Sequence, residues 1–210
     1  MIRDTRDRIL DAGLSLFSKK GFLGSTTKEI AKKAGVAELT LFRHFSSKER
    51  LFEETIKRHS FLPALKGLLP ELKDLDYREA LTLIAVRYLE RLSARSGLIR
   101  NMHSEIHSYP AKVREIQHNF VAEMISTLAS YFRGLQESGV LRDFDPVITS
   151  RAFLGMFFSY FTSEEFMADR KHRFARKDEV IREFVGIFVS GTAAQAPESR
   201  VSVTGKGQSH

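Results

Sequence analysis

The chain has 210 residues, a net charge of +7, a hydrophobic fraction of 42% and no cysteine. The apolar content argues against a disordered chain, and the missing cysteine excludes disulfides, thiolate zinc sites and cysteine nucleophiles. No window reaches the roughly 18 apolar residues of a membrane-spanning helix, and the first residues lack the apolar segment of a secretory signal, so we expect a cytoplasmic protein with no membrane partner.

Helical periodicity runs through almost the whole chain, which predicts an all-α fold. The first predicted helix covers residues 6–20 and ends at Gly21, a residue type that is common at helix C-termini. Residues 26–29 (TTKE) and 46–49 (SSKE) both have the pattern of a capping box, in which a hydroxyl and a carboxylate bond free backbone amides. We therefore expect further helices to begin after Thr26 and Ser46.

The second part of the chain predicts longer helices. Pro63 and Pro70 are expected to break residues 62–74 into short turns, and Gly97 to end the next helix. The predicted helices cover residues 77–95, 98–107, 111–137, 146–167 and 178–192. A basic linker is predicted at 169–177, and the small, polar residues 194–210 predict a disordered tail.

Residues 27–44 predict two short helices, 27–33 and 38–44, joined by a tight turn at Gly35. This arrangement can place its second helix in the major groove of DNA. We expect the second helix to pack through its apolar residues, Leu39, Leu41, Phe42 and Phe45. Its remaining residues are polar or basic and suit contacts to base edges and phosphates: Glu38, Thr40, Arg43 and His44. Lys28 and Lys48 flank this group.

Positive charge is concentrated near this segment. Residues 1–60 contain thirteen Lys and Arg against eight Asp and Glu. Such a local excess is typical of a phosphate-binding surface, although an ordinary solvated face would also have it. Residues 26–52 could also be only a compact three-helix packing unit. The two capping patterns, together with the turn at residues 34–36 (Ala-Gly-Val), favour DNA binding.

Three motifs resemble the TetR family of transcriptional repressors: LFSKKGF at the end of the first helix, TTKEIAKKAGV, and LTLFRHFSSKERLF. The similarity covers roughly the first 55 residues, and beyond them only the number and order of helices agree. The resemblance implies a three-helix helix-turn-helix DNA-binding domain followed by a larger helical ligand-binding and dimerisation domain. We place these domains at residues 1–50 and 51–193, with the tail at 194–210.

The resemblance also implies roles for single residues. Thr27 and Lys28 would lie against phosphates or bases, and Lys48 would bind a phosphate. The DNA-facing positions of the second motif helix correspond to Ala37, Glu38, Thr40 and His44, with Phe42 and Arg43 beside them. Two positions depart from the family pattern: Phe42 stands where tyrosine is most common, and Ala37 where a serine cap is common. Glu38 could accept a hydrogen bond from a cytosine amino group or could repel phosphate.

The family resemblance implies a homodimer that binds a palindromic operator, and a small-molecule effector. We assign the dimer interface to the last two predicted helices, 146–167 and 178–192, because they are too apolar for a single buried face. Met and aromatic residues at helical spacing are candidates for an effector pocket, and ordinary core packing is the alternative interpretation. These candidates are Tyr88, Met102, Ile106, Phe120, Met124 and Phe157. Such a lining suggests an apolar or aromatic effector.

His103 and His107 are four residues apart and could face one metal ion, but no third ligand is evident, so a polar pocket rim or plain surface is favoured. We expect no cofactor and no catalysis, since no nucleophile–base pair, paired carboxylates or phosphate loop is present. The predicted function is that of a ligand-responsive repressor, in which the helix at residues 48–59 transmits the signal. The rival interpretation is a helical enzyme or lipid carrier with an apolar cavity.

Overall fold

The computed structural model describes residues 4–105, 107–167 and 176–194 of the chain. Every regular element in these ranges is helical, and an isolated bridge joins Leu141 to Ala193. The α-helices are α1 (Thr5–Lys20), α2 (Thr27–Ala34), α3 (Glu38–His44), α4 (Lys48–His59), α5 (Phe61–Leu68), α6 (Tyr77–Ser93), α7 (Ser96–Glu105), α8 (Ala111–Glu137), α9 (Pro146–Thr162) and α10 (Lys177–Thr192). The predicted all-α fold is confirmed. Most of the predicted basic linker and the predicted tail from residue 195 onward lie outside the described residues.

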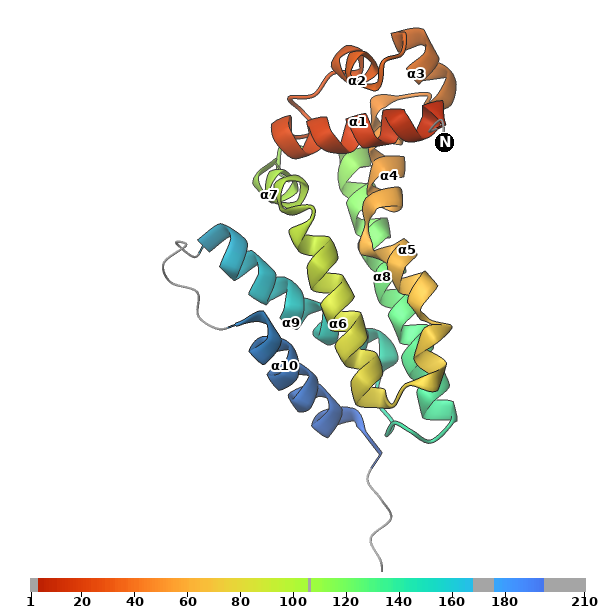
Figure 1. The fold of residues 1–210 in the computed structure, drawn as a ribbon, viewed down its shortest axis with the longest axis vertical. Helices are drawn as coiled ribbons and strands as arrows, with labels where there is room; N and C mark the ends of the chain where they lie inside the picture. Colours follow the sequence, from red (N-terminus) through yellow and green to blue (C-terminus); the bar gives the residue numbers. More distant parts are fainter. Residues whose placement is uncertain (1–3, 106, 168–175, 195–210) are drawn as a thin grey trace, which may run out of the picture.

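Helices α1 to α4 form a small unit at one end of the molecule, which we call the head (Figure 1). Its buried side chains come from all four helices and include Ile9, Leu10, Phe17, Ile30, Leu41, Phe45, Leu51 and Phe52. Thr26 and Glu29 form the predicted capping box at the start of α2. Gly35 ends α2 with φ 68° and ψ 39°, a left-handed conformation that glycine adopts without steric cost.

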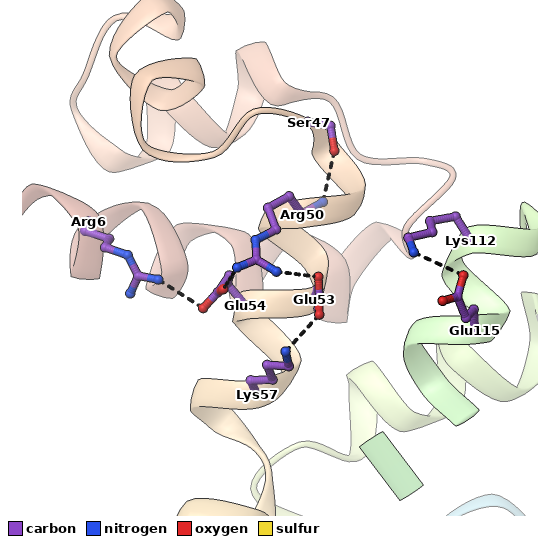
Figure 2. Close-up of polar contacts among 8 residues, drawn as sticks. All are labelled: Arg6, Ser47, Arg50, Glu53, Glu54, Lys57, Lys112 and Glu115. Carbon is purple, nitrogen blue, oxygen red and sulfur yellow. Dashed lines mark hydrogen bonds and ion pairs between the residues drawn. The ribbon is translucent and has the colours of Figure 1, made fainter. Parts of the chain in front are cut away.

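The start of α4 differs from the prediction. Ser47, not Ser46, is the N-terminal cap, and its hydroxyl accepts a hydrogen bond from the backbone amide of Arg50 at 3.1 Å. The capping box predicted at residues 46–49 is therefore wrong, because Arg50 occupies the position at which Glu49 was expected. Figure 2 shows this cap and the ion pairs below it, in which Glu54 accepts from Arg6 of α1 at 3.0 Å and from Arg50 at 2.7 Å.

Helices α5 to α10 form the larger unit, which we call the body (Figure 1). Two further predictions fail here. Residues 61–68 form the helix α5, because Pro63 falls in its first turn, where the missing N–H is not needed. Gly97 lies near the start of α7 and does not end α6, whose last residue is Ser93. Ring contacts join α9 to α10, with centroids 5.0 Å apart for Phe153 and Phe188.

The head and the body pack against each other in one contact region, which we call the joint. Leu98 of α7, Tyr109, and Val113 and Ile116 of α8 belong to the core of the head. Helix α4 continues from the head into the body, so the domain boundary at residue 50 stays a prediction. Among the described residues, no helix has the length and apolar character needed to cross a membrane.

Candidate DNA-binding surface and ligand cavity

Helix α3 presents a mixed apolar and basic face to solvent at the end of the head. Its buried stripe consists of Leu41, followed by Phe45 at the C-terminal cap. Leu39 is 64% exposed and Phe42 is 43% exposed, so the prediction that both pack inward is wrong. The cause is geometric, since residues four apart share a helix face and Leu39 lies on the opposite one. Arg43 is exposed next to them, as predicted from the sequence.

A short hydrogen bond connects the two helices of the motif. The Thr27 hydroxyl of α2 donates to a carboxylate oxygen of Glu38 in α3 at 2.6 Å. Ala37 begins α3 without a side-chain cap, as its residue type implies. Glu38 therefore binds within the protein, close to the uncapped helix N-terminus, where a negative charge is favourable. Thr40 is half-buried, and His44 and Lys28 are exposed.

Lys48 occupies a different environment from the other basic residues. Its ammonium lies 4.3 Å from the centroid of the Phe22 ring, in cation–π geometry. Burial lowers the pKa of Lys48, and the charges of Glu49 and Glu105 oppose that shift. The side chain thus contributes to the joint between head and body. Its proposed contact with a phosphate stays a prediction.

A cavity of about 540 Å³ lies in the body, close to the head. Residues of helices α4 to α9 line it. Four of the six predicted effector contacts, Tyr88, Met102, Phe120 and Met124, are part of this lining. Phe157 is not, because its fully buried ring packs on Phe153 and Phe184, with centroids 5.1 and 5.5 Å away. Ile106 lies outside the described residues.

The cavity also has polar lining residues, of which only His103 is considered for a pocket rim from the sequence. They are His59, Ser60, Arg91, Arg95, His103, Arg114, Gln117, His118 and Arg151. One signal was available in the sequence, because Tyr88, Leu92 and Arg95 follow the spacing of a single stripe in the helix predicted at residues 77–95. A basic residue in an otherwise apolar stripe is unusual and would have indicated a polar end to the cavity.

The two histidines of α7 and the loop after it are both exposed, but only His103 lines the cavity. It stacks on Phe158, with ring centroids 5.7 Å apart. Among the described residues, no three His, Asp, Glu or Cys side chains are grouped so that they could hold a metal ion. The stacking supports the interpretation of His103 as part of a cavity rim.

Helix α7 contacts both the cavity and the head. The Asn101 side-chain amide donates to the carbonyl oxygens of Phe17 at 3.0 Å and Ser18 at 2.9 Å. A carboxylate oxygen of Glu105 accepts from the backbone amide of Phe22 at 3.1 Å. These bonds hold the C-terminus of α1 and the loop that leads to α2.

Comparison with known proteins agrees with this geometry. Residues 9–55 match the family described as "Bacterial regulatory proteins, tetR family", and residues 79–191 match "AefR-like transcriptional repressor, C-terminal domain". The HTH-type transcriptional regulator YvkB of Bacillus subtilis (strain 168) is 32% identical over 197 residues, which cover 92% of this chain and 100% of YvkB. The HTH-type transcriptional repressor KstR2 of Rhodococcus jostii (strain RHA1) is 27% identical over 198 residues, covering 90% of this chain and 91% of KstR2.

A solved structure extends the similarity to the whole fold. A TetR-family transcriptional regulator from Mesorhizobium loti MAFF303099 superposes with a TM-score of 0.73 at 24% identity, covering 90% of this chain and 97% of its own. The helix-turn-helix geometry, both family matches and the similarity to YvkB over its full length lead to one conclusion. The chain belongs to the TetR family of DNA-binding transcriptional regulators, which are not enzymes.

Proposed function

We propose that the chain is a repressor that binds a palindromic operator as a homodimer and leaves it when a small apolar or aromatic effector enters the cavity. One observation carries the ligand response: the walls of the cavity are the helices that hold the head. Ile56 and His59 of α4 line the cavity, and so do Leu98 and Met102 of α7. A ligand that displaces these side chains also displaces the supports of α1.

The exposed face of α3 is the proposed DNA contact. Arg43, His44 and Lys28 can reach phosphates or base edges, and Thr40 can bond a base edge. The exposed Leu39 adds an apolar group, which suits the methyl group of thymine. A protein that acts on the chromosome works in the cytoplasm of a bacterium, and we place this chain there.

The proposed dimer interface is the outer face of α9 and α10. Ile148 is 67% exposed and Ile187 is 65% exposed, although both lie on helices whose inner faces are fully packed. Gly191 is also exposed on α10 and permits close approach of a second chain. A two-fold dimer presents two α3 helices, which must match major grooves about 34–36 Å apart or a multiple of this distance.

Coupling between the sites is reciprocal in this mechanism. If the effector favours a head arrangement that no longer fits both half-sites, then operator DNA must weaken effector binding by the same factor. The proposed conformational change passes through α4 and α7, since both helices contact the cavity and α1.

The test is selection of bound sequences from random DNA with the full-length protein, followed by a mobility-shift assay on the selected site. We expect a palindrome, and we expect Thr40→Ala to weaken binding while Thr127→Ala, at a half-buried position on α8 in the body, leaves it unchanged. Binding without any sequence preference at moderate salt would overturn the proposal. A protein that binds apolar ligands but no DNA would instead be a carrier.

A further inference from the structure

The cavity has an unusual charge composition for an apolar site. Among its described lining residues, none is Asp or Glu, whereas four are arginines and three are histidines. The remaining lining is almost entirely aliphatic, aromatic or methionine. A guanidinium group beside an apolar cavity is costly unless an anion or hydrogen-bond acceptor compensates it.

Three buried polar atoms on the cavity lining form no hydrogen bond with any described residue, although one of them, Nε2 of His59, lies within ion-pair distance of Asp11. They are Nε2 of His59, Nε of Arg95 and Nε2 of Gln117. They come from α4, the turn after α6, and α8 respectively. Buried polar groups without partners are rare in native proteins and call for an explanation, such as a ligand that supplies the acceptor.

Three of the charged groups on the lining lie at the ends of two helices. Arg91 lies in the last turn of α6 and Arg95 in the turn that follows this helix, and neither forms an ion pair within the described residues. His59 lies at the C-terminal end of α4, and its Nε2 is 3.4 Å from a carboxylate oxygen of Asp11 in α1. Burial is the main cause that lowers the pKa of His59, the positive charges of Arg95, Arg58 and Arg91 add to it, and Asp11 opposes it.

Much of the remaining lining is apolar. Phe61 and Tyr88 pack with ring centroids 5.0 Å apart, and Met124, Ile125 and Leu154 continue the lining, with Arg151 one turn before Leu154 on α9. The cavity volume of about 540 Å³ falls within the range of roughly 300–1,000 Å³ that is usual for small-molecule sites. The site therefore offers an apolar chamber with hydrogen-bond donors and positive charge on its lining.

We propose that the effector is an amphipathic acid, an apolar molecule with one carboxylate that binds between Arg95, Arg91 and His59. This inference rests on the proposed ligand response and specifies its chemistry. The carboxylate accepts hydrogen bonds from Arg95 and from Gln117, while the apolar part fills the chamber beside Tyr88. Because His59 also faces Asp11, the bound carboxylate competes with α1 for this side chain, which connects occupancy of the cavity to the head.

Isothermal titration calorimetry on the full chain tests the inference with two pairs of probes. Each pair consists of a carboxylic acid and the alcohol with the same carbon skeleton. The pairs are decanoic acid with decan-1-ol, and 4-phenylbutanoic acid with 4-phenylbutan-1-ol. We expect each acid to bind at least about tenfold more tightly than its alcohol, since hydrogen bonds to charged groups are the stronger ones. Equal affinities, tighter binding of the alcohols, or no binding of either acid would overturn the inference.

Two variants locate the carboxylate. Arg95→Met is expected to reduce the affinity for the acids to that of the alcohols, without changing the affinity for the alcohols. The matched control is Arg87→Met, which removes an arginine two turns earlier on α6 that pairs with Glu90 at 3.2 Å outside this cavity. It should leave all four affinities unchanged. If Arg95→Met does not fold, the comparison of acids with alcohols on the unaltered chain still decides whether the cavity prefers a carboxylate.

A mobility-shift assay with the selected operator separates this inference from the proposed function. If the acids bind preferentially but do not release DNA, the amphipathic-acid site stands and the ligand-responsive function is wrong. If an alcohol binds better than its acid and releases DNA, the ligand-responsive function stands and the acid inference is wrong.

Discussion

The side-chain amide of Asn101 in α7 donates to the carbonyl oxygen of Phe17 in the last turn of α1, at 3.0 Å, and to that of Ser18 at 2.9 Å. The last carbonyls of a helix lack some of their partners within the helix, so this amide acts as a cap supplied by the body, although the Phe17 carbonyl also accepts from the backbone amide of Gly21 at 3.0 Å. A cavity wall thereby supports the first helix of the head. Movement of α7 is expected to change the orientation of α1.

Asn101→Ala should weaken this support. We expect the free energy of unfolding to fall by about 1–3 kcal/mol, since the two hydrogen bonds are lost and the carbonyls are partly buried. The factor by which a bound effector lowers the affinity for the operator should decrease at the same time, because α7 no longer holds α1. Urea denaturation and mobility shifts measure both quantities. Ser104→Ala, an exposed change on the same helix, is the control, and equal behaviour of the two variants would contradict the role of Asn101.

Gly21 is expected to tolerate replacement poorly. Its φ of 72° and ψ of 177° are accessible almost only to glycine, and a Cβ there would collide with the carboxylate of Glu105. We expect Gly21→Ala to lower the unfolding free energy by about 2–5 kcal/mol, combining backbone strain with the loss of the Glu105–Phe22 hydrogen bond. Gly139→Ala has a similar φ of 75° but open space around it, and should cost only about 1–2 kcal/mol. Thermal unfolding of both variants gives the comparison, and equal losses would show that the contact with Glu105 is unimportant.

Glu38→Gln tests the role of the one acidic residue on α3. The amide can still accept from the Thr27 hydroxyl, so the head should keep its fold, while a negative charge disappears from the proposed DNA face. We expect tighter binding to non-specific DNA and a salt dependence whose slope is steeper by about one unit. Fluorescence anisotropy at several salt concentrations measures this. Glu137→Gln, at the far end of α8, is the control. Weaker binding of Glu38→Gln to the selected operator alone would instead show that Glu38 contacts a base.

His59 should make stability depend on pH. Burial is the main cause that lowers the pKa of His59 below its ordinary value of 6.5, the charge of Arg95 adds to it, and Asp11 opposes it. Between the two pKa values the unfolded chain binds more protons than the folded chain, so stability falls as the pH drops below about 6.5. Urea denaturation from pH 5 to pH 7.5 should show this decline. His59→Gln should reduce its slope, whereas His107→Gln, an exposed histidine, should not; an unchanged slope in His59→Gln would exclude His59 as the cause.

Ile187→Glu tests the proposed dimer. The side chain is 65% exposed on α10, so a glutamate there should leave the fold of one chain intact but disfavour an apolar interface. We expect a monomer in sedimentation experiments and a loss of affinity for the palindromic operator. Val140→Glu places the same charge at an exposed apolar position outside α9 and α10 and should stay dimeric. If Ile187→Glu remained a dimer with unchanged affinity for the operator, the dimer interface would have to lie elsewhere on the protein.

The sequence by itself determined the helix-turn-helix and the order of the helices. The capping box at Thr26, the left-handed turn at Gly35 and the amphipathic stripes are local features, and local geometry predicts them without knowledge of distant partners. The predictions of a cap at Ser46 and of a helix break at Pro63 were wrong, and both concern the start of a helix. The adjacent Ser47 can also cap α4, and a proline is tolerated in the first turn of α5. Only the tertiary structure decided the exposure of Leu39, because a short helix has no long stripe from which the buried face can be inferred.

The tertiary structure also decided the composition of the cavity and the joint with the head. His59 and Gln117 lie on two helices and Arg95 in a turn between two others, and only the packing of these distant segments brings the three side chains to one cavity. The contact between Asn101 and Phe17 joins residues 84 positions apart, and no periodicity encodes such a pair. Local propensities therefore specify the helices of this regulator. The docking of α7 and α8 against the head determines which ligands the cavity can bind and which helices a bound ligand can displace.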